Sequence, residues 1–382
     1  MSIKPFHIDV STKVIDDMKQ RISNTRWPDE LPGTDWDYGS NMDYVKDLAD
    51  YWVTQYDWKK HEAFLNGFSQ YVADVQGMNI HYVHERGVGA NPIPLLITHG
   101  WPSTFWEISK IIPMLADPAS YGGDSSDSFD VIVPSMPSYG FSDRTTERGW
   151  SFSKVGDLWS VLMTEVLGYD KFAAQGGDWG AGVTASLGYN HADKMLGIHV
   201  TAVSGLPDVG PGSAPLTEAE RTFVEARAQW REDEGAYGHI QGTKPQTLSY
   251  GLTDSPVGLA AWIVEKFRSW SDCNGDVESV YTKDELLTNI TIYWVTETIS
   301  SSIRIYYESL KDPLELKPGE KIEVPTAVAR FPKDINYPPR EWAERMFNLQ
   351  QWTEMSSGGH FAALEKPNEL VDDIRKFFRK FR

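Results

Sequence analysis

The stretch QGGDWGA, residues 175–181, joins a short β-rich run at residues 172–175 to a helical pattern at residues 180–190. Its three small residues permit a sharp turn from strand to helix, which would raise the side chain of Asp178 above the edge of a sheet. This is the arrangement of a nucleophile elbow, with an aspartate in the position where esterases carry a serine. The stretch alone equally fits a tight turn in which Asp178 caps the helix, so other parts of the sequence must decide.

Short β-rich runs alternate with helical patterns on both sides of this stretch. Residues 71–75 and 78–84 predict a hairpin, and strands and helices then alternate as far as residue 205. Such alternation is typical of a mostly parallel sheet covered by helices on both faces, so the predicted fold class is α/β. The predicted strands of the alternating part are residues 94–98, 131–134, 172–175 and 196–203, and its predicted helices are residues 106–115, 152–167 and 180–190.

The chain divides into four predicted segments. Residues 1–70 have helical patterns and no strand rhythm, so we expect an N-terminal meander. Residues 71–205 and 311–382 are expected to form the two parts of the α/β core. Residues 206–310 are helical only, and we expect them to form a cap over the carboxyl ends of the strands, where ligands bind. The remaining predicted helices are residues 14–24, 42–55, 58–66, 218–234, 258–270, 283–310 and 367–381, and the remaining predicted strands are residues 325–331 and 351–355.

Three further motifs each follow a predicted strand. The turn HGWP, residues 99–102, can direct the backbone N–H of Trp101 at the same point as that of Trp179, which makes an oxyanion hole. Asp334 ends the sequence FPKD, and His360 lies in the sequence GGHF. With Asp178 as nucleophile, these residues follow the chain order nucleophile, acid, histidine that an α/β-hydrolase triad requires.

One alternative remains for the acid of this triad. Asp208 follows the predicted strand at residues 196–203, and the fold tolerates an acid at that position. We rank Asp334 above Asp208, because the separation of Asp334 from His360 and its place after the later strand suit the triad better.

Composition limits the functions that the chain can have. With 54 acidic and 36 basic residues among 382, the formal net charge is −18, and so negative a surface repels nucleic acid and anionic membranes. The single cysteine, Cys273, excludes an internal disulfide, and the N-terminus has no apolar leader, so we expect a soluble cytoplasmic protein. No cofactor or metal ion is expected: a GxGxxA pattern at residues 180–185 lies inside the elbow helix, and His81 and His84 point to opposite faces of a strand.

The motifs together resemble the epoxide hydrolases of the α/β-hydrolase superfamily, in the microsomal, juvenile-hormone and fungal branch that carries an N-terminal meander. The resemblance extends over essentially the whole chain and includes two segments of the predicted cap. It implies that Tyr237 and Tyr306 donate a proton to the epoxide oxygen, with the neighbouring Tyr307 less favoured. Two positions depart from the pattern: Ser138 replaces a glycine, and Asp334 follows the fungal members rather than the glutamate of the microsomal ones.

The resemblance implies an epoxide hydrolase that converts an epoxide and water to a vicinal diol through an ester on Asp178. His360 would act as general base on the hydrolytic water, Asp334 would orient His360, and the amides of Trp101 and Trp179 would stabilise the oxyanion. A carboxylate nucleophile also suits an alkyl halide, so a haloalkane dehalogenase is an alternative, as is a non-catalytic receptor of the same fold. The expected substrate is a small apolar or aromatic epoxide, and the formation of a homodimer is left open.

Overall fold

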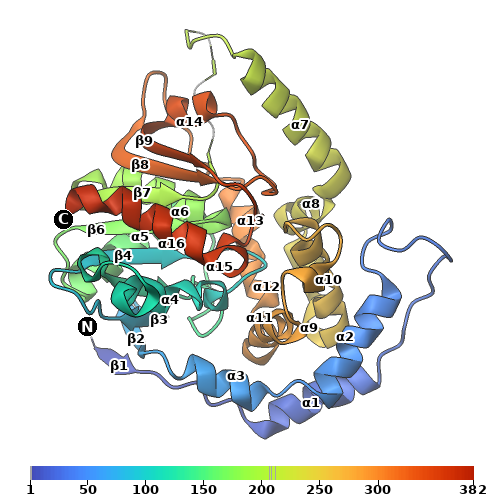
Figure 1. Ribbon diagram of the computed structural model, residues 1–382. Helices are drawn as coiled ribbons and strands as arrows, with labels where there is room; N and C mark the ends of the chain where they lie inside the picture. Colours follow the sequence, from blue (N-terminus) through green and yellow to red (C-terminus); the bar gives the residue numbers. More distant parts are fainter. Residues whose placement is uncertain (1, 206, 208, 211) are drawn as a thin grey trace.

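The computed structural model describes residues 2–205, 207, 209–210 and 212–382 (Figure 1). Within these residues the chain forms one nine-stranded sheet in the order β1-β2-β3-β5-β4-β6-β7-β8-β9. The pairs from β1 to β5 are antiparallel and those from β5 to β9 are parallel, which confirms the predicted α/β class. The strands are β1 (Ile3–Pro5), β2 (Gln70–Val75), β3 (Met78–Glu85), β4 (Ile93–Thr98), β5 (Phe129–Pro134), β6 (Phe172–Gly176), β7 (Met195–Val200), β8 (Ile322–Arg330) and β9 (Phe347–Glu354).

Helices cover both faces of the sheet, with α16 in front of it and α6 behind it in Figure 1. Successive residues of β7 show this, because strand side chains alternate between faces. A methyl group at Gly197 would lie 3.2 Å from the ring of Phe377 in α16, whereas Ile198 packs against Gly188 of α6. The covering helices are α4 (Ile111–Ala116), α5 (Phe152–Val161), α6 (Asp178–Asn190) and α16 (Pro367–Phe378).

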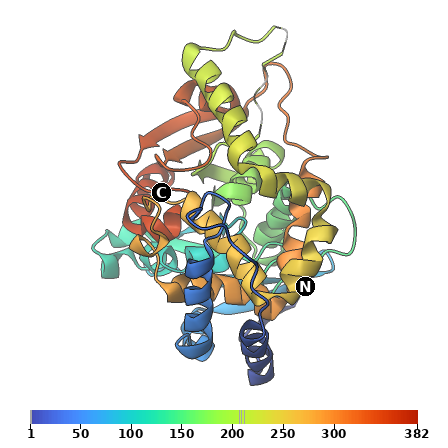
Figure 2. The ribbon, with the colours of Figure 1, turned by 90° about the vertical axis from the view of Figure 1, so that its right-hand side faces the viewer.

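An all-helical block, comprising the helices between residues 218 and 310, lies beside the carboxyl ends of the parallel strands (Figures 1 and 2). The helical pattern at residues 283–310 proves to be three helices rather than one. The first break falls at Glu297, which has a φ of +53° that no α-helix accommodates, and the second falls at Ile303. The helices of this helical block are α7 (Glu218–Glu234), α8 (Ala236–Thr243), α9 (Pro245–Asp254), α10 (Pro256–Ser269), α11 (Lys283–Thr296), α12 (Ile299–Ser302) and α13 (Arg304–Ser309).

The N-terminal segment packs against both the sheet and the helical block. Its strand β1, which the sequence did not predict, pairs antiparallel with β2 at the edge of the sheet. The indole N–H of Trp52 donates to Thr291 Oγ1 of α11 at 3.1 Å, and the hydroxyl of Tyr51 donates to Asp284 of the same helix at 3.0 Å. The helices of this segment are α1 (Thr12–Ser23), α2 (Met42–Thr54) and α3 (Trp58–Leu65).

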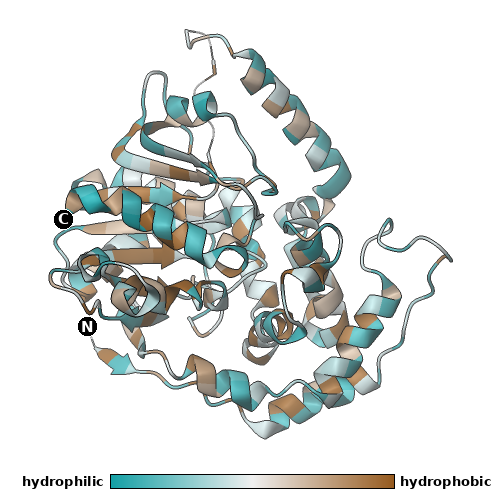
Figure 3. Ribbon diagram, in the orientation of Figure 1, coloured by the Kyte–Doolittle hydropathy of each residue, from teal (hydrophilic) through white to brown (hydrophobic). Residues whose placement is uncertain are grey.

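Hydropathy follows burial along the outer helices (Figure 3). In α16 the buried apolar residues Leu370, Ile374 and Phe377 recur every three or four positions, so one stripe of the helix faces the sheet and the opposite stripe is polar. Among the helices that the structure describes, none is long and apolar enough to cross a bilayer.

Candidate active site

Asp178 is the first residue of α6 and lies in the sharp turn predicted from the sequence. Its φ is +48°, a left-handed conformation that costs a residue other than glycine on the order of 1 kcal/mol. The turn leaves no room for side chains at two of its glycines. A Cβ at Gly176 would lie 2.2 Å from the carbonyl oxygen of Gly180, and a Cβ at Gly180 would lie 1.9 Å from that of Thr98. The backbone therefore holds Asp178 in one position at the carboxyl end of the sheet.

The turn that follows β4 binds one carboxylate oxygen of Asp178. The backbone N–H of Trp101 donates to Asp178 Oδ1 at 2.7 Å. Glycine is required beside it, since a Cβ at Gly100 would lie 2.2 Å from the same oxygen. Within the described residues no hydrogen bond joins the amide of Trp179 to Asp178, so the place of Trp179 in an oxyanion hole stays a prediction.

Helix α11 of the helical block fixes the same turn from outside. The side-chain amide of Asn289 donates to the carbonyl oxygen of Pro102 at 2.7 Å, and the hydroxyl of Tyr293 donates to that of Ser103 at 2.7 Å. From inside, His99 Nδ1 donates to the carbonyl of Gly100 at 3.1 Å. The backbone donor at Trp101 is thus held by hydrogen bonds from α11 and by one within the turn itself.

His360 lies between two carboxylates. Its Nδ1 is 2.7 Å from Asp334 Oδ1, and its Nε2 is 3.3 Å from Asp178 Oδ2. Burial alone would lower the pKa of His360, but Asp334 and Asp178 together raise it well above the usual value. The side chain of Asp334 is 2% exposed and that of Asp178 is 19% exposed, so Asp178 is the more accessible of the two carboxylates. Asp208, the alternative acid, lies outside the described residues.

Tyr237 and Tyr306 reach the site from the helical block, on α8 and α13. Their ring centroids are 6.0 Å apart. The ring of Tyr237 stacks on that of Trp101 at 5.6 Å, and the ring of Tyr306 packs edge-on against Trp179 at 4.8 Å. Burial raises the pKa of both phenols, and the charge of Asp178 raises it further, so both carry their protons at neutral pH.

Tyr307, the less favoured candidate, points elsewhere. Its ring lies 3.7 Å from the ammonium of Lys311, and this cation lowers the pKa of its phenol. It does not line the cavity that holds Tyr306.

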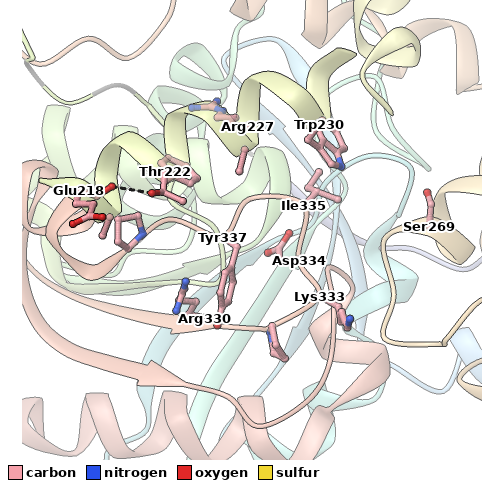
Figure 4. A pocket seen from close by; sticks show the side chains of 15 residues that line it. Glu218, Thr222, Arg227, Trp230, Ser269, Arg330, Lys333, Asp334, Ile335 and Tyr337 are labelled. Carbon is pink, nitrogen blue, oxygen red and sulfur yellow. Dashed lines mark hydrogen bonds between the residues drawn. The ribbon is translucent and has the colours of Figure 1, made fainter. Parts of the chain in front are cut away.

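Two adjoining cavities lead to these residues. The inner cavity has a volume of about 200 Å³ and is lined by the predicted residues Asp178, Trp179, Tyr237, Tyr306 and His360. The outer cavity has a volume of about 950 Å³ and lies between α7 and the loop after β8 (Figure 4). Arg227, Trp230 and Ile335 line both cavities, so the two adjoin at these side chains.

Glu107 is a carboxyl group near the site that no sequence motif indicated. It lies in η1 (Phe105–Ile108) and accepts a hydrogen bond from the hydroxyl of Ser103. Burial raises its pKa to about 7, while the charge of His360 opposes this change. In the part of the chain that the structure describes, no three His, Cys, Asp or Glu side chains are grouped so that they can hold a metal ion.

Comparison with known proteins shows the family to which the chain belongs. Residues 3–108 match the family model for the epoxide hydrolase N terminus, and residues 93–263 match that for the alpha/beta hydrolase fold. Epoxide hydrolase 1 of Sus scrofa is 36% identical over 402 residues, which cover 98% of this chain and 88% of the pig protein. The chain belongs to the epoxide hydrolase family.

Two solved epoxide hydrolases share the fold over the full length of the chain. The juvenile hormone epoxide hydrolase of Bombyx mori is 30% identical with a TM-score of 0.89, and the match covers 100% of this chain and 95% of that one. The Aspergillus niger epoxide hydrolase is 27% identical with a TM-score of 0.86, and the match covers 100% and 97%. The chain is therefore a hydrolase that acts on epoxides, and the resemblance drawn from its motifs is confirmed.

Proposed function

We propose that this epoxide hydrolase opens its substrate with the carboxylate of Asp178 and then hydrolyses the resulting glycol ester with water activated by His360. The observation that carries the proposal is the position of Asp178, with Oδ1 2.7 Å from the amide of Trp101 and Oδ2 3.3 Å from Nε2 of His360. One oxygen is held where an oxyanion would form, and the other is left to attack.

In the first half-reaction Oδ2 of Asp178 forms a bond to a ring carbon and the carbon–oxygen bond of the epoxide breaks. The released oxygen takes a proton from Tyr237 or Tyr306, whose raised pKa keeps both phenols protonated. Neither an alkyl halide nor a receptor ligand needs such donors, which supports epoxide hydrolysis over the two alternatives. Release of bromide from a bromoalkane at a comparable rate would favour the haloalkane dehalogenase instead.

In the second half-reaction the charge of Asp178 is gone, because its carboxylate has become an ester. One of the two carboxylates that raise the pKa of His360 is thereby removed, so the pKa falls and His360 can serve as general base. Asp334 keeps its hydrogen bond to Nδ1 and orients the ring. His360 passes its proton to the tyrosinate left by the first half-reaction and then takes a proton from water as that water attacks the carbonyl carbon of Asp178. The ester carbon–oxygen bond breaks, the leaving diol oxygen takes this proton, and Asp178 gives its remaining proton to His360 as the carboxylate re-forms. The Trp101 amide stabilises the oxyanion, and the amide of Trp179 is the proposed second donor.

The lining of the inner cavity supports a small apolar or aromatic epoxide as substrate. Its volume of about 200 Å³ is smaller than the roughly 300–1,000 Å³ of typical ligand sites. The rings of Trp179, Tyr237 and Tyr306 contribute apolar surface around the nucleophile. The proposed reaction uses the side chains of the protein and water, and it requires no cofactor.

The test is to stop the reaction at the ester by replacing His360→Gln. Because His360 acts only on the second half-reaction, this variant should consume one equivalent of styrene oxide and then stall. Intact-protein mass spectrometry should show the mass of one substrate added. An Asp178→Ala control should gain no mass, and continued steady turnover by His360→Gln would contradict the proposal.

A further inference from the structure

Lys266 is a buried cation for which the mechanism above has no use. It lies in α10 and is 6% exposed, an unusual position for a lysine. Its ammonium forms an ion pair with Glu265, which supplies the buried charge with a counter-ion.

The ammonium of Lys266 lies over the ring of Tyr237. Its Nζ is 4.8 Å from the centroid of that ring and 5.9 Å from the centroid of the Trp270 ring, both within the range of a cation–π contact. Trp270 packs in turn against Tyr237 and His360, each at a centroid distance of 5.1 Å. Among the described cation–π contacts none joins Lys266 to Tyr306, so the cation distinguishes between the two tyrosines.

The other charges around Tyr237 make a phenolate costly. Burial raises the pKa of Tyr237 most, Asp178 and then Glu265 raise it further, and a hydrogen bond with Tyr306 only partly opposes them. Beside Glu265, Glu234 of α7 is a second carboxyl group near Lys266. In such surroundings the phenol of Tyr237 loses its proton readily only if a nearby positive charge stabilises the phenolate. Lys266 is a cation that contacts its ring.

We propose that Lys266 is a positioning residue that makes Tyr237 the stronger of the two proton donors. As the O–H bond of Tyr237 breaks, the proton moves to the oxygen released from the ring carbon, and negative charge spreads into the phenol ring. A cation over that ring stabilises the developing phenolate more than the neutral phenol, so its effect is largest in the transition state. The inference rests on the proposed function, because it requires Tyr237 to act as a donor.

The first test compares three variants by their single-turnover alkylation rate on styrene oxide. Lys266→Met removes the charge and keeps much of the side-chain volume, so the rate should fall about tenfold with substrate affinity unchanged. Lys266→Arg retains a cation and should restore most of the rate. Arg268→Met is the matched control, since Arg268 lies on the same helix over Trp36 rather than over Tyr237. A rate for Lys266→Met equal to that of the parent would overturn the inference.

The decisive test places Lys266→Met in two backgrounds. In Tyr306→Phe only Tyr237 donates, so the loss of the cation should slow alkylation at least tenfold. In Tyr237→Phe the loss should disappear. Equal losses in both backgrounds would show that Lys266 acts through structure alone and would overturn the inference.

Two other outcomes, a variant that does not fold and a failure of the donor assignment itself, can be told apart from the results above. If Lys266→Met does not fold, the same comparison between Lys266→Gln and Lys266→Arg applies in both backgrounds. If replacing both tyrosines leaves alkylation unchanged, the donor assignment itself fails, and this inference fails with it.

Discussion

The charge of His360 depends on the state of its neighbour Asp178. In the free enzyme the two carboxylates beside His360 raise its pKa, which favours the protonated ring over the neutral ring that a base requires. Once Asp178 is esterified, only Asp334 remains to hold the proton. In the proposed mechanism, the first half-reaction therefore prepares the base for the second.

The assignment of Asp334 as triad acid yields a prediction at the same scale. Replacing Asp334→Asn should slow hydrolysis of the ester by at least about 10²-fold, because the ring of His360 loses its orienting charge. Rapid-quench measurement of ester decay would give this rate. Asp208→Asn is the matched comparison and should have little effect, and the reverse ranking would make Asp208 the acid.

At the scale of elements, the helical block both covers the active site and supplies side chains to it. Helices α8 and α13 supply Tyr237 and Tyr306, and α11 fixes the turn that carries Trp101 through hydrogen bonds from Asn289 and Tyr293. The tyrosines proposed as proton donors and the turn that carries the proposed oxyanion donor are thus positioned by the same block of helices.

The two tyrosines are predicted to substitute for each other. Each of the variants Tyr237→Phe and Tyr306→Phe should lose less than the ~10²–10⁴-fold expected of general acid catalysis, because one donor remains. The double variant should lose more than either, and the two losses should not be independent. Alkylation rates on styrene oxide measure this, with Tyr307→Phe as the control. A double variant within a few-fold of the parent would remove the case for the tyrosines.

Local sequence predicts an element well when the signal lies within the element itself. Helix α7 begins and ends at the predicted residues, with a capping box between Thr217 and Glu220. Strand β1 escaped prediction because three exposed residues have no pattern, and only pairing with β2 makes them a strand. The break in the helix at Glu297 was not predicted either, because no glycine or proline lies at that position.

The residues of the active site also differ in how well the sequence predicts them. Asp178, Asp334 and His360 were predictable because each follows a strand within a motif, and parallel strands end at one edge of the sheet. Glu107 and Lys266 were not, because their contacts join segments far apart in the chain and depend on tertiary packing.

On the scale of the whole molecule, the N-terminal segment connects the sheet edge to the active site. Strand β1 pairs with β2, the helix that carries Trp52 bonds to α11, and α11 bonds to the turn that holds Trp101. A series of contacts within the described residues therefore joins the first strand to the turn that carries Trp101, the proposed oxyanion donor.

The junction of the two cavities should control which epoxides reach Asp178. Trp230 lines both cavities and stands close to Ile335 in Figure 4. Replacing Trp230→Ala should raise kcat/KM for a bulky epoxide such as trans-stilbene oxide about tenfold relative to styrene oxide. The control is Val224→Ala, an exposed position on α7 that lines neither cavity. An unchanged ratio of the two substrates would show that the epoxides enter elsewhere.

The covalent role of Asp178 is tested most directly by a single turnover in ¹⁸O-labelled water with enzyme in excess. If Asp178 attacks the epoxide, the diol takes its new oxygen from the unlabelled carboxylate, and the label from water enters Asp178. Mass spectrometry of the peptide that contains Asp178 should then show a gain of one ¹⁸O, and the first diol should be unlabelled. Label in the diol with none in Asp178 would mean that water attacks the epoxide directly, and the account would be wrong.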